Sequence, residues 1–327
     1  MTHIVKVVYE RLEDLCNVEN FHPFIAENIG DILIFDIETT GLHHKNCEVI
    51  LIGYLYVKNN KVYIEQLFAE TPDEEYEILQ AFNDIASKYT YLLSYNGNSF
   101  DIPFLNSRFK YNQLAHTLSK SMNIDLLRVA RLLASTLNLE NYKLKTVERF
   151  LGIYREDTIS GKDSVDLYNQ YVYRPTPALK EKILLHNYED ILYLGKVIDL
   201  LSYQSHDDYS NLPLYFKYND NRLYILKQKI SKDFLSVELF SRDVCKNAVH
   251  FLPGQLSLEQ VGHSISLKIP IFALMIDTET LRFIDVDLIT EKKIQFNTLS
   301  VEEKMNYYIE TNTLQFSINA LFLLLNL

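Results

Sequence analysis

Tryptophan is absent from the 327 residues of this chain, and cysteine is scarce. The three cysteines, Cys16, Cys47 and Cys245, stand far apart and show no paired spacing. This distribution argues against a disulfide framework and against a cysteine-rich zinc site, and it suits a reducing compartment.

Long hydrophobic runs are also missing. The longest largely apolar run covers residues 318–327, and it is too short to cross a bilayer because a spanning helix needs about 20 apolar residues. The first residues, MTHIVKVVYERLEDL, lack the basic start and the continuous apolar core of a secretory signal. We therefore expect a cytoplasmic protein without a membrane partner, and the sequence leaves the protein partners unknown.

An excess of positive charge is missing as well. The 32 Lys and Arg are outnumbered by 43 Asp and Glu, which gives a formal net charge of −11. Strong non-specific binding to duplex nucleic acid depends on neutralising phosphates with Lys and Arg, so it is not expected here. Two interpretations stay open. Either nucleic acid is not the partner, or carboxylates gather at a site that bound cations make positive.

Strand and helix patterns alternate from residue 31 to residue 201. Strands are predicted at 31–39, 49–58, 62–68, 91–95 and 122–124, and helices at 74–88, at about 100–110 and through most of 126–201. After the polar stretch 204–211, five strands are predicted at 212–218, 222–230, 234–240, 266–276 and 280–289, with one or two helices in 301–327. The sequence therefore predicts an α/β domain over residues 1–204 and a small β-rich domain over residues 205–327.

The segment ILIFDIETTGL, residues 32–42, carries the first chemical signal. Its first four residues are apolar on both faces, as in a central strand. Because side chains alternate along a strand, Asp36 and Glu38 project from the same face. Two adjacent carboxylates at the end of a buried strand are costly without cations. Capping of a helix or pairing with lysine is the alternative explanation.

The segment YLLSYNGNSFDIPFL, residues 91–105, carries the second signal. A strand runs into a glycine-containing turn, and Asn98 or Ser99 can cap the helix that follows. Asp101 then lies in the first turn of that helix. An ordinary acidic residue favoured by the helix dipole is the alternative.

The helical segment around HNYED, residues 186–190, carries the third signal. His186 and Asp190 are four residues apart and share a helix face with Ile183 and Leu194. The two polar groups thus interrupt a face directed to the interior, although a hydrogen-bonded His–Asp pair in the core stays open. Asp125, by contrast, is predicted to cap a helix rather than to bind metal.

Together, DIETTG, NGNSFD and HNYED resemble the three motifs of the DEDD (DnaQ-like) superfamily of 3′–5′ exonucleases, in the right order and spacing. The likeness continues through YKLKTVERFLGI (142–153) and ISGKDSVDLYNQYV (159–172), a succession that resembles the YprB-type ribonuclease H-like domain family. It covers about residues 25–204 and implies an RNase H-like mixed sheet flanked by helices. The segment after residue 204 carries no such likeness.

The resemblance also implies roles for individual residues. The four metal carboxylates by position are Asp36, Glu38, Asp101 and Asp190, which would hold two divalent cations, Mg²⁺ or Mn²⁺. His186 would be the general base, although it stands four residues before the last aspartate, where the histidine subtype of the superfamily has five. Further residues are implied to contact the substrate: Thr39, Gly41 and Leu42 at the terminal nucleotide, and Asn96 and Phe100 along the cleft, with core packing as the alternative for Phe100.

The function implied is that of a metal-dependent 3′–5′ exonuclease. Two cations about 3.5–4 Å apart activate a water molecule and stabilise the leaving oxygen of a phosphodiester. The expected substrates are single-stranded DNA or RNA ends, since these reach a buried site without unpairing, and the expected products are 5′-mononucleotides. Three alternatives stay open: a nucleic-acid-binding module that has lost turnover, an endonuclease with the same chemistry, and a protein whose main role lies in the C-terminal region.

Overall fold

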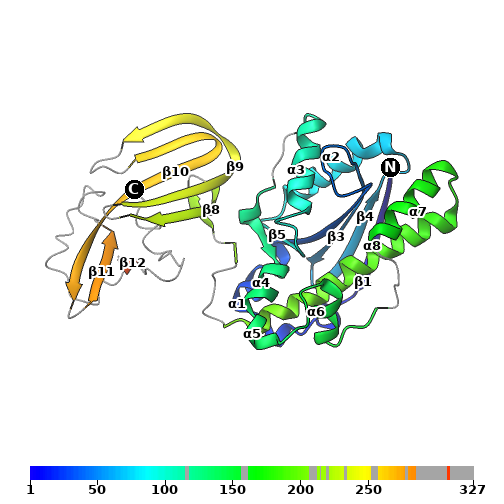
Figure 1. The fold of residues 1–327 in the computed structure, drawn as a ribbon, viewed down its shortest axis with the longest axis horizontal. Coiled ribbons are helices and arrows are strands. Elements are labelled where there is room, and N and C mark those ends of the chain that lie inside the picture. The colour runs from blue at the N-terminus through cyan, green and yellow to red at the C-terminus, as the bar shows by residue number, and fades with distance from the viewer. Residues whose placement is uncertain are drawn as a thin grey trace. The chain divides into compact units, whose positions relative to one another are not determined.

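The structure is a computed structural model that describes residues 1–114, 118–155, 161–205, 212–213, 215–218, 221–231, 234–251, 257–276, 279–284 and 308–309. The chain divides into two compact units, Met1–Leu212 and Pro213–Leu327. This division falls eight residues beyond the boundary predicted after residue 204. Figure 1 shows helices and strands together in the first unit and strands in the second.

The first unit is built on a mixed sheet, which confirms the predicted α/β class. Within the described residues the strand order is β1-β4-β3-β2-β5-β6. Strands β1, β4, β3 and β2 pair antiparallel, whereas β5 and β6 run parallel to β2. The strands are β1 Thr2–Tyr9, β2 Ile32–Thr39, β3 Val49–Lys58, β4 Lys61–Phe68, β5 Tyr91–Ser94 and β6 Asn123–Asp125. All but β1 were predicted from the sequence.

Eight α-helices are described in the first unit: α1 Pro23–Asn28, α2 Glu75–Ala86, α3 Asp101–Tyr111, α4 Leu126–Leu132, α5 Ala134–Leu137, α6 Leu144–Phe150, α7 Gly161–Tyr173 and α8 Pro177–Val197. The last of these begins with strong start signals. Thr176 Oγ1 accepts a hydrogen bond from the backbone N–H of Leu179 at 3.4 Å, and Pro177 occupies the first helical position. Helix α8 continues directly into the 3₁₀ helix η6, Ile198–Tyr203.

Helices cover both faces of this sheet (Figure 1). Leu33, Phe35 and Ile37 of β2 pack into one core cluster with Phe82 of α2 and Phe104 of α3. A second cluster joins strands β3 and β4 to helices α7 and α8. Because side chains alternate along β2, Asp36 and Glu38 face the opposite side of the sheet, which α7 and α8 cover. The sheet therefore directs Asp36 and Glu38 toward the helix that carries the third motif.

The second unit contains an antiparallel sheet with the order β12-β11-β10-β9-β8-β7 within its described residues. Its strands are β7 Tyr215–Tyr218, β8 Asn221–Ile230, β9 Phe234–Phe251, β10 Ser257–Ile276, β11 Glu279–Ile284 and β12 Tyr308–Ile309. Leu235, Val237 and Leu239 alternate with less buried residues and form part of its core. The β-rich character predicted for this region is thus confirmed.

Two predictions for the second unit are wrong in detail. Strands β9 and β10 are longer than expected, since they pair with each other far beyond residue 240 and well before residue 266. Tyr308 and Ile309 were predicted to be helical, but they pair with Phe283 and Arg282 of β11 and form a strand. The remaining residues of the predicted C-terminal helices lie outside the described part of the chain. Among the residues that are described, no helix has the length and low polarity needed to cross a bilayer.

Candidate active site

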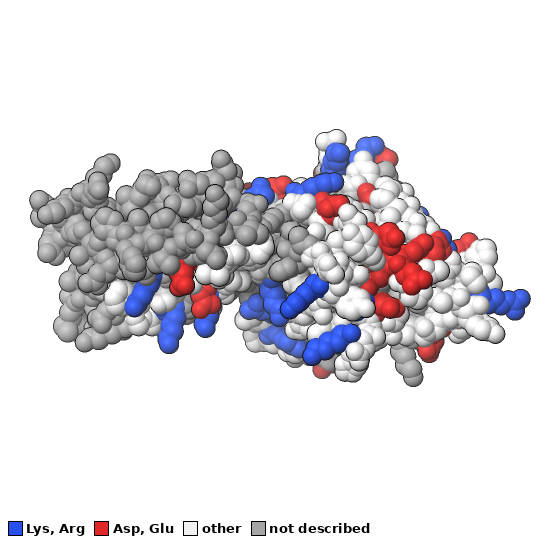
Figure 2. Space-filling model, turned by 90° about the horizontal axis from the view of Figure 1, so that it is seen from above, with Lys and Arg blue, Asp and Glu red and all other residues white. Residues whose placement is uncertain are grey.

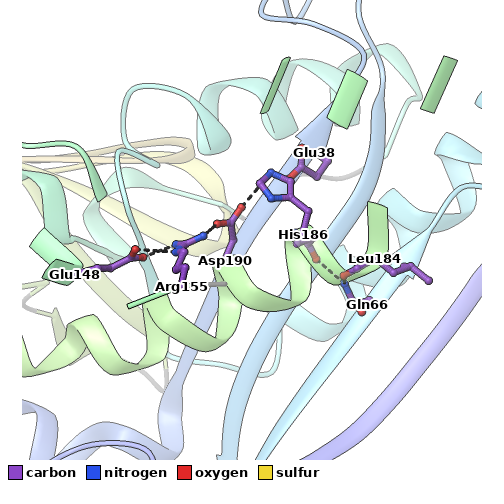
Figure 3. A network of polar contacts seen from close by, with 8 residues as sticks. Glu38, Gln66, Glu148, Arg155, Leu184, His186 and Asp190 are labelled. Carbon is purple, nitrogen blue, oxygen red and sulfur yellow. Dashed lines mark hydrogen bonds and ion pairs between the residues drawn. The ribbon is translucent and has the colours of Figure 1, made fainter. Parts of the chain in front are cut away.

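Glu38, His186 and Asp190 come together on the α8 side of the sheet (Figure 3). His186 Nε2 lies 3.5 Å from Glu38 Oε1 and 3.5 Å from Asp190 Oδ2. One potential ligand atom from each residue falls within 4.8 Å of the others. Glu38 and His186 are buried. Carboxylate oxygens are the donors that Mg²⁺ and Mn²⁺ prefer, so this group of residues fits a divalent cation.

A buried amide helps to attach helix α8 to the sheet. Gln66 of β4 donates from Nε2 to the backbone carbonyl of Leu184 at 2.8 Å and to Asn187 Oδ1 at 3.0 Å. These bonds fix the turn of α8 that carries His186. Sequence analysis did not single out Gln66, because a glutamine in a strand gives no sign of a partner more than a hundred residues away.

Asp36 lies among the other carboxylates. Burial raises the pKa of its carboxyl group well above the ordinary value, and the charges of Asp101, Asp190 and Glu38 raise this pKa further. Like charges act on one another in this way only at close range. The charges of the acids on β2, α3 and α8 thus act on one another, and the distances between side-chain atoms place Glu38 and Asp190 together with His186.

The Glu38 carboxyl group also has an unusual pKa. Burial is the largest cause and raises its pKa to about 7, with Asp190 acting in the same direction. The positive charge available on His186 and the hydroxyl of Ser164 act in the opposite direction. Ser164 belongs to α7 and is fully buried. It faces Glu38 from the helix packed beside α8, and it was not identified from the sequence.

Asp101 is the first residue of α3, as predicted. Its carboxyl group is bonded by its own backbone N–H and by the backbone N–H of Ile37, which stands between Asp36 and Glu38. Burial is nevertheless the largest effect and raises the pKa of Asp101 to about 7. The bond to Ile37 explains how the start of α3 is held against the end of β2.

The turn before α3 is organised by Asp125. This residue accepts backbone N–H groups of Asn96 at 2.9 Å, Asn98 at 3.1 Å and Leu127 at 3.1 Å. The last bond caps α4, so the predicted capping role is confirmed. Neither Asn98 nor Ser99 caps α3 through its side chain, contrary to prediction. Asn98 Oδ1 instead accepts a bond from the side chain of a buried asparagine on β6.

The predicted substrate-contact residues occupy different environments. Thr39 is buried and donates from Oγ1 to the carbonyl of Gly41 at 2.8 Å, which closes the turn after β2. Leu42, at the end of that turn, is 79% exposed. Asn96 has a left-handed backbone with φ of 67°. Phe100 packs against the core cluster of β2, α2 and α3, with its ring 5.6 Å from that of Phe104, which favours the core-packing interpretation for this residue.

A buried arginine, Arg155, completes this group of residues. Arg155 forms ion pairs with Glu148 of α6 and with Asp190 (Figure 3). Its charge lowers the pKa of Asp36, against the effect of the neighbouring acids. Glu148 belongs to the segment YKLKTVERFLGI, and Arg155 follows two residues after it. Nothing in their spacing of seven residues indicates that they pair, so sequence analysis gave them no role.

The fold agrees with the protein family that the chain matches. The model of the RNase_H superfamily matches residues 33–202. This range runs from β2 into η6 and includes the turn of the second motif and the third motif on α8. The match covers more than half of the chain, and the chain belongs to the RNase_H superfamily.

Individual relatives cover only parts of the chain. DNA polymerase III PolC-type from Caldanaerobacter subterraneus subsp. tengcongensis is 32% identical over 147 residues, which are 38% of this chain and 10% of that protein. The chain therefore spans about a tenth of the length of this relative. Among solved structures, the family B DNA polymerase of the archaeon Pyrobaculum calidifontis is 15% identical, with a TM-score of 0.42, over 63% of this chain and 33% of that one. Exonuclease I of E. coli, in complex with a dT13 oligonucleotide, is 17% identical, with a TM-score of 0.33, over 47% and 43%.

Proposed function

We propose that this protein is a metal-dependent 3′–5′ exonuclease that hydrolyses the ends of single-stranded DNA or RNA to 5′-mononucleotides. The observation that carries the proposal is the cluster of Glu38, His186 and Asp190, whose potential ligand atoms lie within 4.8 Å of one another. The charges of Asp36 and Asp101 act on the same group of acids. Such a group of buried and half-buried acids is unfavourable unless cations or protons neutralise it. Membership of the RNase_H superfamily gives a second, independent support.

The four carboxylates would hold two divalent cations. Glu38 and Asp190 each present an oxygen close to His186, and the charges of Asp101, Asp190 and Glu38 all act on Asp36. When bound, the cations supply a water of lowered pKa and neutralise charge on the leaving 3′ oxygen. The protein's own contribution is to hold the carboxylates in place through β2, the start of α3 and α8.

His186 would accept the proton of the attacking water. Imidazole ordinarily titrates near neutrality, which suits a general base. Its Nε2 atom is equally distant from one oxygen of Glu38 and one of Asp190, so it faces the region in which a water held by those carboxylates would stand. The general-base role is favoured over a purely structural one because the imidazole points toward the acids and not into the apolar core.

Single-stranded ends are the substrate that reaches a buried site most readily. On the face shown in Figure 2, Asp and Glu side chains form one large group, and Lys and Arg side chains stand mostly apart from it. A surface of this kind does not favour non-specific binding to a duplex. A frayed or single strand reaches a buried site without the cost of unpairing. The turn of Thr39, Gly41 and Leu42 and the turn of Asn96 would border the terminal nucleotide.

A two-label nuclease assay tests this proposal. The purified protein is given Mg²⁺ or Mn²⁺ and single-stranded DNA or RNA labelled at the 5′ or at the 3′ end. We expect early release of a labelled mononucleotide from 3′-labelled strands and a shortening ladder from 5′-labelled strands. Asp36→Ala should abolish both. Undiminished hydrolysis by Asp36→Ala would refute the assignment of the site.

Two competing functions are separated in the same experiment. Cleavage of a circular single strand would indicate an endonuclease. Binding of the oligonucleotide and of Mn²⁺ without any hydrolysis would indicate a nucleic-acid-binding module that has lost turnover.

A further inference from the structure

A buried ion pair lies next to the fourth carboxylate of the site. Glu148 of α6 and Arg155 expose only 1% and 5% of their side chains. Arg155 Nε donates to Glu148 Oε2 at 2.7 Å, and its Nη2 donates to Glu148 Oε1. This is the forked arrangement in which a planar guanidinium binds a carboxylate with both donors of one edge. Glu148 therefore fixes the plane of the guanidinium.

The remaining nitrogen of Arg155 reaches the site. Its Nη1 donates to Asp190 Oδ1, while Asp190 Oδ2 lies 3.5 Å from His186 Nε2 (Figure 3). The two oxygens of Asp190 thus have different partners. Arg155 also lies over the ring of Tyr193 on α8, with 5.2 Å between the guanidinium carbon and the ring centroid. These contacts hold Arg155 from two helices.

We propose that Arg155, held by Glu148, is a positioning residue that orients Asp190, so that Oδ2 faces Glu38 and His186. The inference rests on the proposed function, because it assigns Asp190 to a cation site. A carboxylate on a helix can rotate about its side-chain torsions and present either oxygen, or neither, to a ligand. A bond to Oδ1 from a fixed donor removes this freedom.

A simple counter-charge is the competing explanation for Arg155. The charge of Arg155 is already matched by Glu148, so the pair is neutral as a unit. A bare counter-charge beside a cation site would compete with the cation, and its removal would strengthen cation binding. Loss of a residue that orients a ligand weakens metal binding, typically by about 10–100-fold. The two explanations therefore predict opposite changes in cation affinity when Arg155 is removed.

The experiment uses the full chain with Glu148→Gln and Arg155→Gln combined. This double variant leaves the net charge of the pair unchanged at zero, and it avoids a buried unpaired charge. Binding of Mn²⁺ is measured by electron paramagnetic resonance in the absence of nucleic acid. We expect binding about 10–100-fold weaker than in the wild type, and a lower kcat at subsaturating Mn²⁺ with little change in KM for the oligonucleotide.

A matched control is available in the same domain. Glu75 of α2 and Arg108 of α3 also form a buried forked pair, with 6% of each side chain exposed. Glu75→Gln combined with Arg108→Gln should lower stability by a similar mechanism but leave Mn²⁺ binding unchanged. Arg155→Lys keeps the charge and loses the fork, so it should weaken Mn²⁺ binding as the double variant does. If the double variant does not fold, Arg155→Lys alone tests the positioning role.

The outcomes separate this inference from the proposed function. Wild-type Mn²⁺ affinity in the double variant, or in Arg155→Lys if only that protein folds, would overturn the positioning role while leaving the nuclease proposal intact. Tighter Mn²⁺ binding would overturn it in favour of a counter-charge. A wild-type protein that binds no Mn²⁺ would contradict the inference and the proposed function together.

Discussion

Gly53 of β3 lies opposite Asp36 of β2 in the antiparallel register. Helix α8 passes over this glycine so closely that an added Cβ would lie 2.1 Å from Asn187 Oδ1 and 2.8 Å from Ile191 Cγ1. Real Cβ contacts do not reach such distances. The absence of a side chain at position 53 therefore sets how near α8, with His186 and Asp190, can approach the acids of β2.

Gly53→Ala should displace α8 and reduce hydrolysis more than it reduces stability. Overpacking at a buried position costs about 1–3 kcal/mol, whereas a displacement of about 1 Å between reacting groups can cost about 100-fold in rate. Gly30→Ala is the control, since nothing lies within 4 Å of a Cβ at that position. Urea unfolding and the 3′-end assay check both quantities, and full activity in Gly53→Ala would show that the approach of α8 is not limiting.

The sequence predicted the central strands of the first unit because their apolar residues sit in continuous or alternating runs. The strand β1, Thr2–Tyr9, was missed because Lys6 interrupts its pattern and its partner β4 lies more than fifty residues away. In the second unit, the pairing of β9 with β10 extends both strands through polar residues such as Glu259 and Gln260. Pairing of this kind is a tertiary contact, and local propensity does not reveal it.

The same distinction applies to the site. The sequence singled out the four acids and His186 because motif order and strand alternation mark them. The residues that hold them were not. Gln66 and Gly53 contact α8, and Arg155, paired with Glu148, contacts Asp190. Each of these contacts becomes visible only when the helix and the sheet are placed together, and none has a fixed spacing in the chain.

The metal-free protein should lose stability as the pH rises from about 4 to about 7. Glu38 and Asp101 have ordinary pKa values of 4.5 and 3.8, and folding raises both to about 7. Between these values the folded state binds more protons than the unfolded state, so the free energy of unfolding falls with increasing pH. The slope reaches about 1.4 kcal/mol per pH unit for one such group.

Unfolding by urea in the presence of a chelator, at pH 5 and at pH 7.5, measures this fall. Glu38→Gln should reduce it, because one of the carboxyl groups with a raised pKa is removed. Added Mn²⁺ should raise stability more at pH 7.5 than at pH 5, since cations bind the ionised carboxylates and release protons. A pH dependence that is the same in Glu38→Gln and in the wild type would contradict the assignment.

Asp125→Asn should destabilise the protein without removing the cation site. Asp125 accepts three backbone N–H groups with its two oxygens, and an asparagine replaces one oxygen with a donor. Bonds to a charged acceptor contribute about 1.5–3 kcal/mol, so a loss of about 2 kcal/mol is expected. Mn²⁺ binding should remain within a few-fold of the wild type, whereas Asp36→Asn should abolish it. Equal loss of Mn²⁺ binding in both variants would make Asp125 a ligand.

His186→Gln tests whether the imidazole acts on a proton or on the cation. Removal of a general base typically lowers kcat by about 100–10,000-fold, and binding of Mn²⁺ should then change by no more than a few-fold. The pH profile adds a second readout, because a rate that depends on a base should lose its ascending limb near neutrality in the variant while the oligonucleotide still binds. His186 Nε2 lies at the same 3.5 Å from Glu38 and Asp190, so the distances alone fit a ligand equally well. Parallel loss of Mn²⁺ binding and of hydrolysis would assign His186 to the cation, and the base would then have to be sought among the other groups that face Glu38.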